Sequence, residues 1–229
     1  VLWNLHKLII ELSKETECNP SKLDSNIMKP LMDLEEKFMF SKLNSTIKKA
    51  TELFESYKLN EVPWAVEDLF LTLSRTYVQI TRDKVGFGSD EEKKTVLYTL
   101  YNVFKENLKI FAPIAPFITE QLWQNMRREF GEDEESVHLC DWPEFDEKKI
   151  ELELEQTFNF VQGIIQAILS AREKAKLSVR WPIALAEVEV GEETDLEGVK
   201  SLKHIIQAQT NCKKINIQTK FPEVKEKLR

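Results

Sequence analysis

Glycine, proline and cysteine are scarce in this chain, which has 6 Gly, 8 Pro and 3 Cys among 229 residues. So few turn-forming residues leave little material for a fold of many short strands, whereas long runs without helix breakers favour helices. Cys18, Cys140 and Cys212 are odd in number and far apart, which fits neither a disulfide framework nor a CxxC metal site. The sequence therefore predicts a mostly α-helical protein of a reducing compartment.

The chain also lacks any apolar run that approaches the roughly 20 residues that a bilayer span requires. No basic region leads into an apolar stretch at its start, so we expect a soluble, untargeted, cytoplasmic protein. Because the sequence begins at Val1 without Met and already in helical rhythm, we expect it to be a piece of something longer. Positive charge is in the minority, since the formal net charge is −7.

Apolar residues at steps of three and four predict a series of helices in the first 130 residues. The first ends before Asn19, the second begins at Pro30 and continues to Tyr57, and the third runs from Pro63 to the Gly86–Gly88 glycine pair. Ser89 with Glu92 forms a capping-box pattern that opens a fourth helix. After a proline corner, a fifth helix closes at Gly131. These elements predict an antiparallel helix bundle.

The pattern changes after Gly131. Residues 131–149 predict a strap across the bundle with Val137, Leu139 and Trp142 facing inward, and a long helix follows from about Glu151 to Lys176. Period-two alternation at 184–190 and 214–217 then predicts two strands, with a helix capped by Thr194 or Asp195 between them. We therefore expect two domains: a bundle with its strap at 1–150, and the long helix with a small β-α-β module at 151–229.

Catalytic constellations are absent from the sequence, which has no glycine-rich phosphate loop, GxSxG elbow or HExxH pair. His138 and Cys140 make only half a metal site. The carboxylates gather in runs such as Glu132–Glu135, which are typical of a solvated surface. The chain by itself is not expected to be catalytic or to bind a metal or cofactor.

The stretch 171–183, AREKAKLSVRWPI, reverses the sign of the chain with a local net charge of +3. One interpretation is a phosphate-binding edge. The alternative is a solvated helix end whose cations complement the helix dipole. Trp181 has two interpretations as well: a stacking platform for a base, or packing at a hinge, which is the commoner role of a large aromatic beside proline.

Five strings in order resemble the C-terminal region of isoleucyl-tRNA synthetases of the archaeal type. They are FSKLN at 40–44, LSRTYV at 73–78, APIAPF at 112–117, SVHLCDWP at 136–143, and the ARxKA to RWP string at 171–182. Phe40 and Thr76 depart from the family's usual residues. Valyl and leucyl enzymes share the bundle, and a helical protein-protein scaffold without a nucleic-acid role is the other alternative.

The resemblance implies that this fragment holds the anticodon stem and loop of tRNA(Ile) and is monomeric. The ATP- and Mg-dependent joining of isoleucine to tRNA(Ile), and editing, would belong to an N-terminal catalytic portion that is absent here. Cations and polar or aromatic side chains would contact the RNA. Arg75 and Arg82 lie seven residues apart, so a regular helix would place them on one face, although an ion-pair ridge with Glu67 or Asp68 is an equal alternative. The candidate tRNA-binding residues are Lys42, Asn44, Lys48, Arg75, Gln79, Arg82, Arg172, Lys174, Lys176, Arg180 and Trp181.

Overall fold

The computed structural model describes residues 1–191 and 196–219, and the chain divides into two compact units, Val1–Glu151 and Leu152–Arg229. Helices dominate both units, which confirms the mostly α-helical class. The predicted caps Thr194 and Asp195 lie outside the described residues. None of the helices in the described part of the chain combines the length and the apolar character needed to cross a bilayer.

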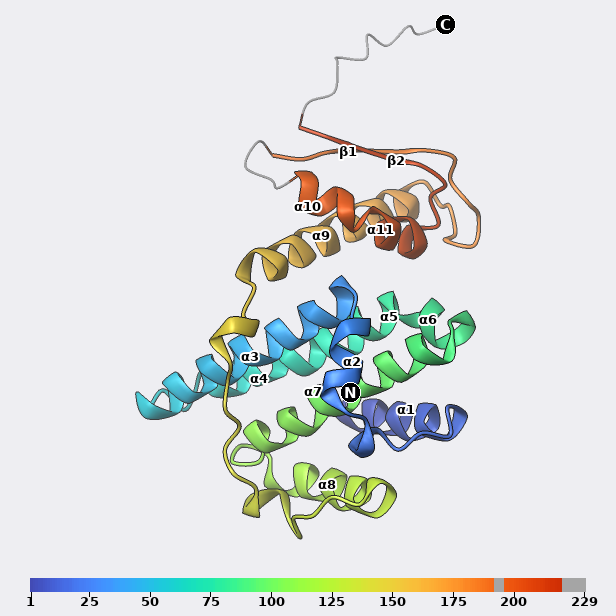
Figure 1. Ribbon diagram of the computed structural model, residues 1–229. Helices are drawn as coiled ribbons and strands as arrows, with labels where there is room; N and C mark the ends of the chain where they lie inside the picture. The colour runs from blue at the N-terminus through green and yellow to red at the C-terminus, as the bar shows by residue number, and fades with distance from the viewer. Residues whose placement is uncertain (192–195, 220–229) are drawn as a thin grey trace, which may run out of the picture. The chain divides into compact units, whose positions relative to one another are not determined.

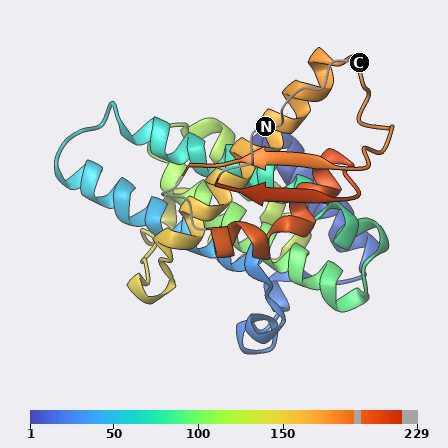
Figure 2. The ribbon, with the colours of Figure 1, turned by 90° about the horizontal axis from the view of Figure 1, so that it is seen from above.

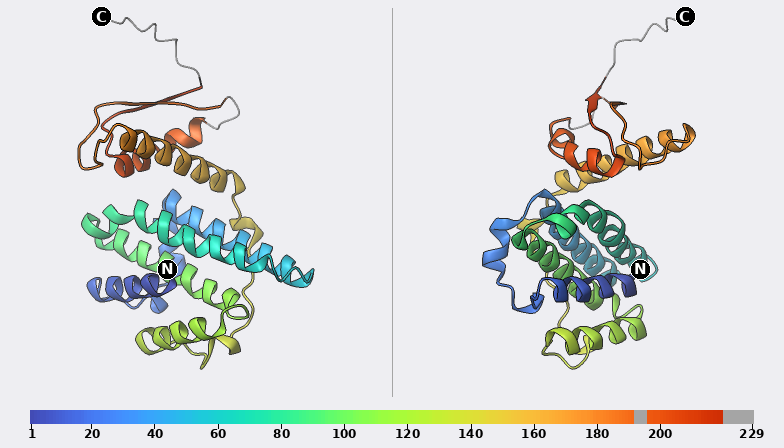
Figure 3. Two further views of the ribbon diagram at one scale, coloured as in Figure 1. Left: turned by 180° about the vertical axis from the view of Figure 1, so that it is seen from behind. Right: turned by 90° about the vertical axis from the view of Figure 1, so that its right-hand side faces the viewer.

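The first unit is a helix bundle built around α7, which contacts α1, α3, α4 and α8 (Figure 1). Figure 3 shows the same packing from behind and from the side. Because α7 is surrounded, its apolar residues such as Leu97 and Phe104 are fully buried. The helices of this unit are α1 (Leu2–Glu15), α2 (Ser25–Met28), α3 (Leu34–Glu55), α4 (Val62–Thr72), α5 (Val78–Ile80), α6 (Arg82–Phe87), α7 (Asp90–Phe111) and α8 (Pro116–Phe130).

Local capping explains where the long helices begin and end. The predicted capping box is present at the start of α7, where the backbone N–H of Ser89 donates to Glu92 Oε2 at 2.7 Å and Ser89 Oγ accepts from the Glu92 N–H. Gly131 ends α8 in the left-handed conformation, with φ at 80°. The predicted start of the second helix at Pro30 is wrong, because Asp33 and Glu36 form another capping box that begins α3 at Leu34.

The third predicted helix is not continuous. A π-helical turn at Leu73–Tyr77 follows α4, and a break at Thr81 separates α5 from α6. The Thr81 hydroxyl donates to the Tyr77 carbonyl at 2.8 Å, a bond back to the preceding turn that often accompanies a bend. No proline or glycine marks either site, so the apolar periodicity continues and hides the interruption.

The strap at 131–151 is fastened along one polar stripe of α3. Asn44 Oδ1 accepts from the Asp146 N–H at 2.7 Å, and Ser41 Oγ accepts from the Glu151 N–H at 2.8 Å. Further along, the Trp142 indole N–H donates to Thr51 Oγ1, and its ring meets Phe54 edge-on. The strap contains short 3-10 turns at Val137–Leu139 and Glu147–Lys149.

Of the three strap residues that were expected to face inward, only Val137 is buried. Leu139 is 64% exposed and Trp142 is 37% exposed. Backbone and hydroxyl hydrogen bonds to α3 fasten much of the strap, so these two side chains do not need to enter the core.

The second unit is a long helix with a small β-α-β module. Its elements are α9 (Leu152–Lys174), β1 (Ala186–Glu189), α10 (Leu196–Ser201), α11 (Lys203–Thr210) and β2 (Ile215–Gln218). The two strands are parallel, with Ala186 opposite Ile215 and Val188 opposite Ile217 (Figure 2). Parallel neighbours require a crossover, which α10 and α11 supply. The predicted module is therefore confirmed, with two helices in place of one.

Candidate nucleic-acid interface

The polar residues predicted on α3 are already engaged inside the first unit. Lys42 Nζ lies 2.6 Å from the Asp68 carboxylate on α4, and Lys48 Nζ lies 2.9 Å from Glu147 in the strap. Asn44 is 5% exposed, and its amide donates to the Phe40 carbonyl while accepting from the strap. The geometry gives these three side chains a role in holding α4 and the strap against α3.

Arg75, Gln79 and Arg82 are exposed on the interrupted helix segment. Arg75 lies in the π-turn, and the break at Thr81 separates it from Arg82. The predicted common face assumes a regular helix of 3.6 residues per turn, so that premise is wrong here. The ion-pair alternative receives no support from Asp68, whose carboxylate pairs with Lys42.

A buried polar cluster anchors the segment that carries Arg82. Lys84 Nζ lies 2.9 Å from Asp33, 3.1 Å from Glu36 and 3.6 Å from Glu35, and the Tyr77 hydroxyl donates to Glu36 at 3.1 Å. Burial raises the pKa of Glu36, and the charge and hydrogen bond of Lys84 oppose part of that effect. Three carboxylates this close together could hold a cation, and the Lys84 ammonium contacts all of them.

The loop at 175–183, between α9 and the bridge of Ile183 to Cys212, and the last residue of α9 before it carry three exposed cations. Lys174, Lys176 and Arg180 are exposed, and none has an acidic partner within salt-bridge distance in the described part of the chain. Lys176 takes the left-handed conformation with φ at 54°, and the Leu177 N–H donates to the Arg172 carbonyl, which ends α9 in a Schellman motif. The chain therefore turns sharply and leaves these cations in solvent.

Trp181 is 71% exposed, so the hinge-packing interpretation of this residue is wrong. Arg172 is the opposite case, because only 2% of it is exposed. Its Nη2 donates to the carbonyls of Ser178 and Trp181, while its Nε and Nη1 have no hydrogen-bond partner among the described residues. Lys174, Lys176, Arg180 and Trp181 are thus all exposed within eight residues of sequence, whereas Arg172 is buried and bonded to the loop.

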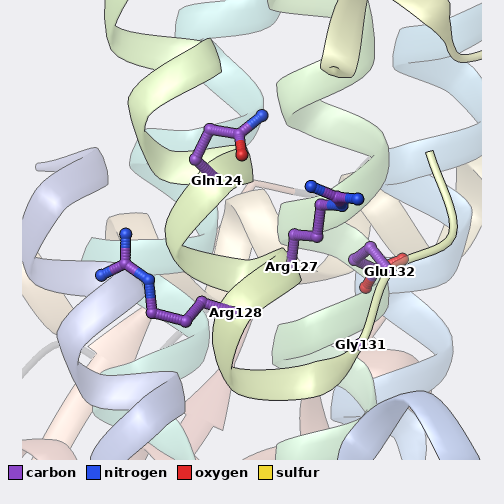
Figure 4. A pocket seen from close by; sticks show the side chains of 5 residues that line it. All are labelled: Gln124, Arg127, Arg128, Gly131 and Glu132. Atoms are coloured by element: carbon purple, nitrogen blue, oxygen red, sulfur yellow. The ribbon is translucent and has the colours of Figure 1, made fainter. Parts of the chain in front are cut away.

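A second cationic feature was missed by the sequence analysis. The end of α8 has a cavity of about 460 Å³ lined by Gln124, Arg127, Arg128, Gly131 and Glu132 (Figure 4). The two guanidinium groups point in different directions, so one anion would not be held by both. The adjacent residues Arg127 and Arg128 could have indicated this feature from the sequence, but the apolar stripe of α8 led to an interpretation of the helix as core packing only.

Glu132 was expected to be solvated and is instead buried. It accepts hydrogen bonds from the Tyr101 hydroxyl and from Lys105 Nζ. Burial, followed by the hydrogen bond and charge of Glu132, raises the pKa of Tyr101. The acid at the end of α8 is therefore a structural anchor, because both of its oxygens bond to α7.

The family profile described as the anticodon-binding domain of tRNA ligase matches residues 36–190, and the chain belongs to this family. The matched range includes the bundle core, the strap, α9 and the cationic loop.

Curated relatives extend the similarity over most of the chain. An isoleucine--tRNA ligase of Pyrococcus abyssi is 34% identical over 219 residues, which is 95% of this chain and 20% of that protein. The enzymes of the same name from Thermococcus kodakarensis and Methanopyrus kandleri are each 32% identical, over 94% and 97% of the chain. The chain spans about a fifth of the length of these relatives.

Proposed function

We propose that this chain binds the anticodon stem and loop of tRNA(Ile) as part of a cytoplasmic, monomeric isoleucine-tRNA ligase. The ATP- and Mg-dependent joining of isoleucine to tRNA would take place on a catalytic portion outside this chain. The observation that carries the proposal is the family match over residues 36–190, together with archaeal relatives named isoleucine--tRNA ligase.

The contacts that we propose fall into three groups. Lys174 at the end of α9 and Lys176, Arg180 and Trp181 in the loop that follows are exposed, where cations can reach phosphates and an indole can stack on an unpaired base. Arg75, Gln79 and Arg82 are exposed on the interrupted helix and are kept as further candidates. Lys42, Asn44, Lys48 and Arg172 are engaged within the fold, so direct contact with RNA would require their present bonds to be broken.

The net charge of −7 does not oppose this proposal. Exposed charges farther apart than the Debye length, about 8 Å at physiological salt, are largely screened from one another. A polyanion therefore responds to the local sign of the surface, which is positive at the loop.

A salt titration tests the proposal. The triple variant Lys174→Gln, Lys176→Gln, Arg180→Gln should bind tRNA(Ile) more weakly, and the slope of log K against log salt should fall by about 2–3 units, since each lost phosphate contact removes about 0.7–0.9. The matched control is Lys7→Gln, Lys14→Gln, Lys22→Gln, which removes the same charge from exposed positions at and just after α1. Equal slopes in the two triple variants would remove the loop from the interface.

The two alternatives have less support. A valyl or leucyl enzyme would share the bundle, but the relatives quoted above are all isoleucine ligases. A protein-protein scaffold would leave the exposed cations Lys174, Lys176 and Arg180 without a role.

A further inference from the structure

We propose that Arg172 and Asn211 are positioning residues that hold the loop at 175–183 in one conformation, so that Trp181 can stack on an unpaired base of the tRNA. This inference rests on the proposed tRNA-binding function. It assigns to Arg172 a role different from direct contact with a phosphate.

Four consecutive backbone carbonyls in the loop are held by these two side chains. Arg172 Nη2 donates to the carbonyls of Ser178, at 2.6 Å, and Trp181. Asn211 Nδ2 donates to the carbonyls of Val179, at 2.8 Å, and Arg180, at 3.4 Å. The two donors come from different elements, since Arg172 belongs to α9 and Asn211 is the residue after α11. The backbone between 178 and 181 is therefore fixed from two directions.

The far end of the loop is fixed as well. The Ile183 N–H donates to the Asn211 carbonyl at 3.0 Å, and the Lys213 N–H donates to the Ile183 carbonyl at 2.8 Å. Asn211 thus bonds the loop through both its side chain and its main chain. Its left-handed conformation, with φ at 50°, allows this turn at the end of α11.

This arrangement has an electrostatic consequence for RNA. A carbonyl oxygen carries partial negative charge and repels phosphate, whereas here four of them are bonded to protein donors. The exposed side chains of the same stretch include the cation of Arg180 and the indole of Trp181. A loop that is ordered before binding also loses less conformational entropy when RNA arrives.

Stability alone does not account for the arginine. A buried guanidinium is costly unless it is fully hydrogen-bonded, and two of the three nitrogens of Arg172 have no partner in the described part of the chain. Replacing a buried charge by an apolar side chain of similar size is often neutral for stability. Among the described residues, the side-chain hydrogen bonds of Arg172 all go to the loop. A residue that is costly to bury and makes such bonds is better explained by the conformation of the loop.

The test uses Arg172→Met and Asn211→Gly in the whole chain labelled with 5-fluorotryptophan. Asn211→Gly removes the amide but tolerates the positive φ, and Glu17→Gly, at φ of 48° in the first unit, is its matched control. The ¹⁹F resonance of Trp181 is assigned by its loss in Trp181→Phe. Arg172→Met and Asn211→Gly should each shift or broaden this resonance and lower the affinity for tRNA(Ile) about tenfold. Both should leave the Trp123 resonance in place. The double variant should be little weaker than either single one, because both act on one loop.

The outcomes separate this inference from the function on which it rests. If the unmodified chain does not bind tRNA(Ile) at low salt, the proposed function fails. If it binds, but Arg172→Met and Asn211→Gly bind as tightly as the unmodified chain, the positioning role is wrong and the proposed function stands. Arg172→Met could instead lower the affinity, reduce the salt slope by about one unit and leave the Trp181 resonance unchanged. That result would mean that Arg172 contacts phosphate directly, which also overturns the positioning role.

Discussion

Replacing Lys84 with Met should destabilise the first unit strongly, and by an amount that depends on pH. The ammonium contacts Asp33, Glu35 and Glu36, and the last two of these carboxylates are buried. Removing one partner from a buried ionic cluster typically costs about 3–5 kcal/mol. Because Lys84 itself is 16% exposed and water can reach part of the site, we expect about 3 kcal/mol at pH 7.5.

The pH dependence follows from the direction of the pKa shifts. Burial raises the pKa of Glu36 above its ordinary value, and Lys84 opposes that rise, so the variant should raise it further. A carboxyl whose pKa is higher in the folded state takes up a proton on folding, and its stabilising contribution is lost as pH rises through the folded-state pKa. The deficit of the variant should therefore shrink as the pH falls from 7.5 toward 4.5.

Urea denaturation followed by tryptophan fluorescence measures this deficit. The control is Lys93→Met on α7, which breaks a pair with Glu15 at 3.1 Å whose acid is 55% exposed, and it should cost no more than about 1 kcal/mol. A Lys84→Met deficit no larger than that of the control, or one that grows on acidification, would contradict the stabilising role of Lys84 in this cluster.

Two smaller predictions concern stability. Burial lowers the pKa of His6, so the folded state resists protonation of this side chain. The stability of the chain should therefore fall as pH drops below about 6.5. His6→Leu should remove the part of this fall that is due to His6, as measured by denaturation curves at pH 7.5 and 5.5. Tyr57 is 87% exposed with φ at 58°, so Tyr57→Gly should stabilise the chain by up to about 1 kcal/mol in thermal unfolding, whereas Ser56→Gly, at negative φ, should destabilise it. A lower midpoint for Tyr57→Gly would contradict the strain argument.

Features that depend on nearby residues were predictable from the sequence. The Ser89–Glu92 capping box, the glycine at the end of α8 and the alternation in β1 and β2 are all set by neighbours within a few positions. The π-turn at Leu73–Tyr77 was not, because no local residue type forces it. Its nearest visible cause is tertiary, since Tyr77 in that turn bonds Glu36 on α3.

The candidate interface divides in the same way. The positive sign of 171–183 and the exposure of Lys174, Lys176 and Arg180 were within reach of the sequence. The burial of Arg172 was not, because its role depends on carbonyls that only the folded loop brings together. Asn211 was missed for the same reason, as it lies 31 residues along the chain from Arg180, to whose carbonyl it donates.

We propose that this chain binds the anticodon stem and loop of tRNA(Ile). The most direct test is the affinity of the unmodified chain for tRNA(Ile), tRNA(Val) and an unrelated RNA hairpin, measured across a range of salt concentrations. The chain should bind tRNA(Ile) more tightly than either competitor, with a steep salt slope. Equal affinity for all three RNAs, or no binding at low salt, would contradict this proposal.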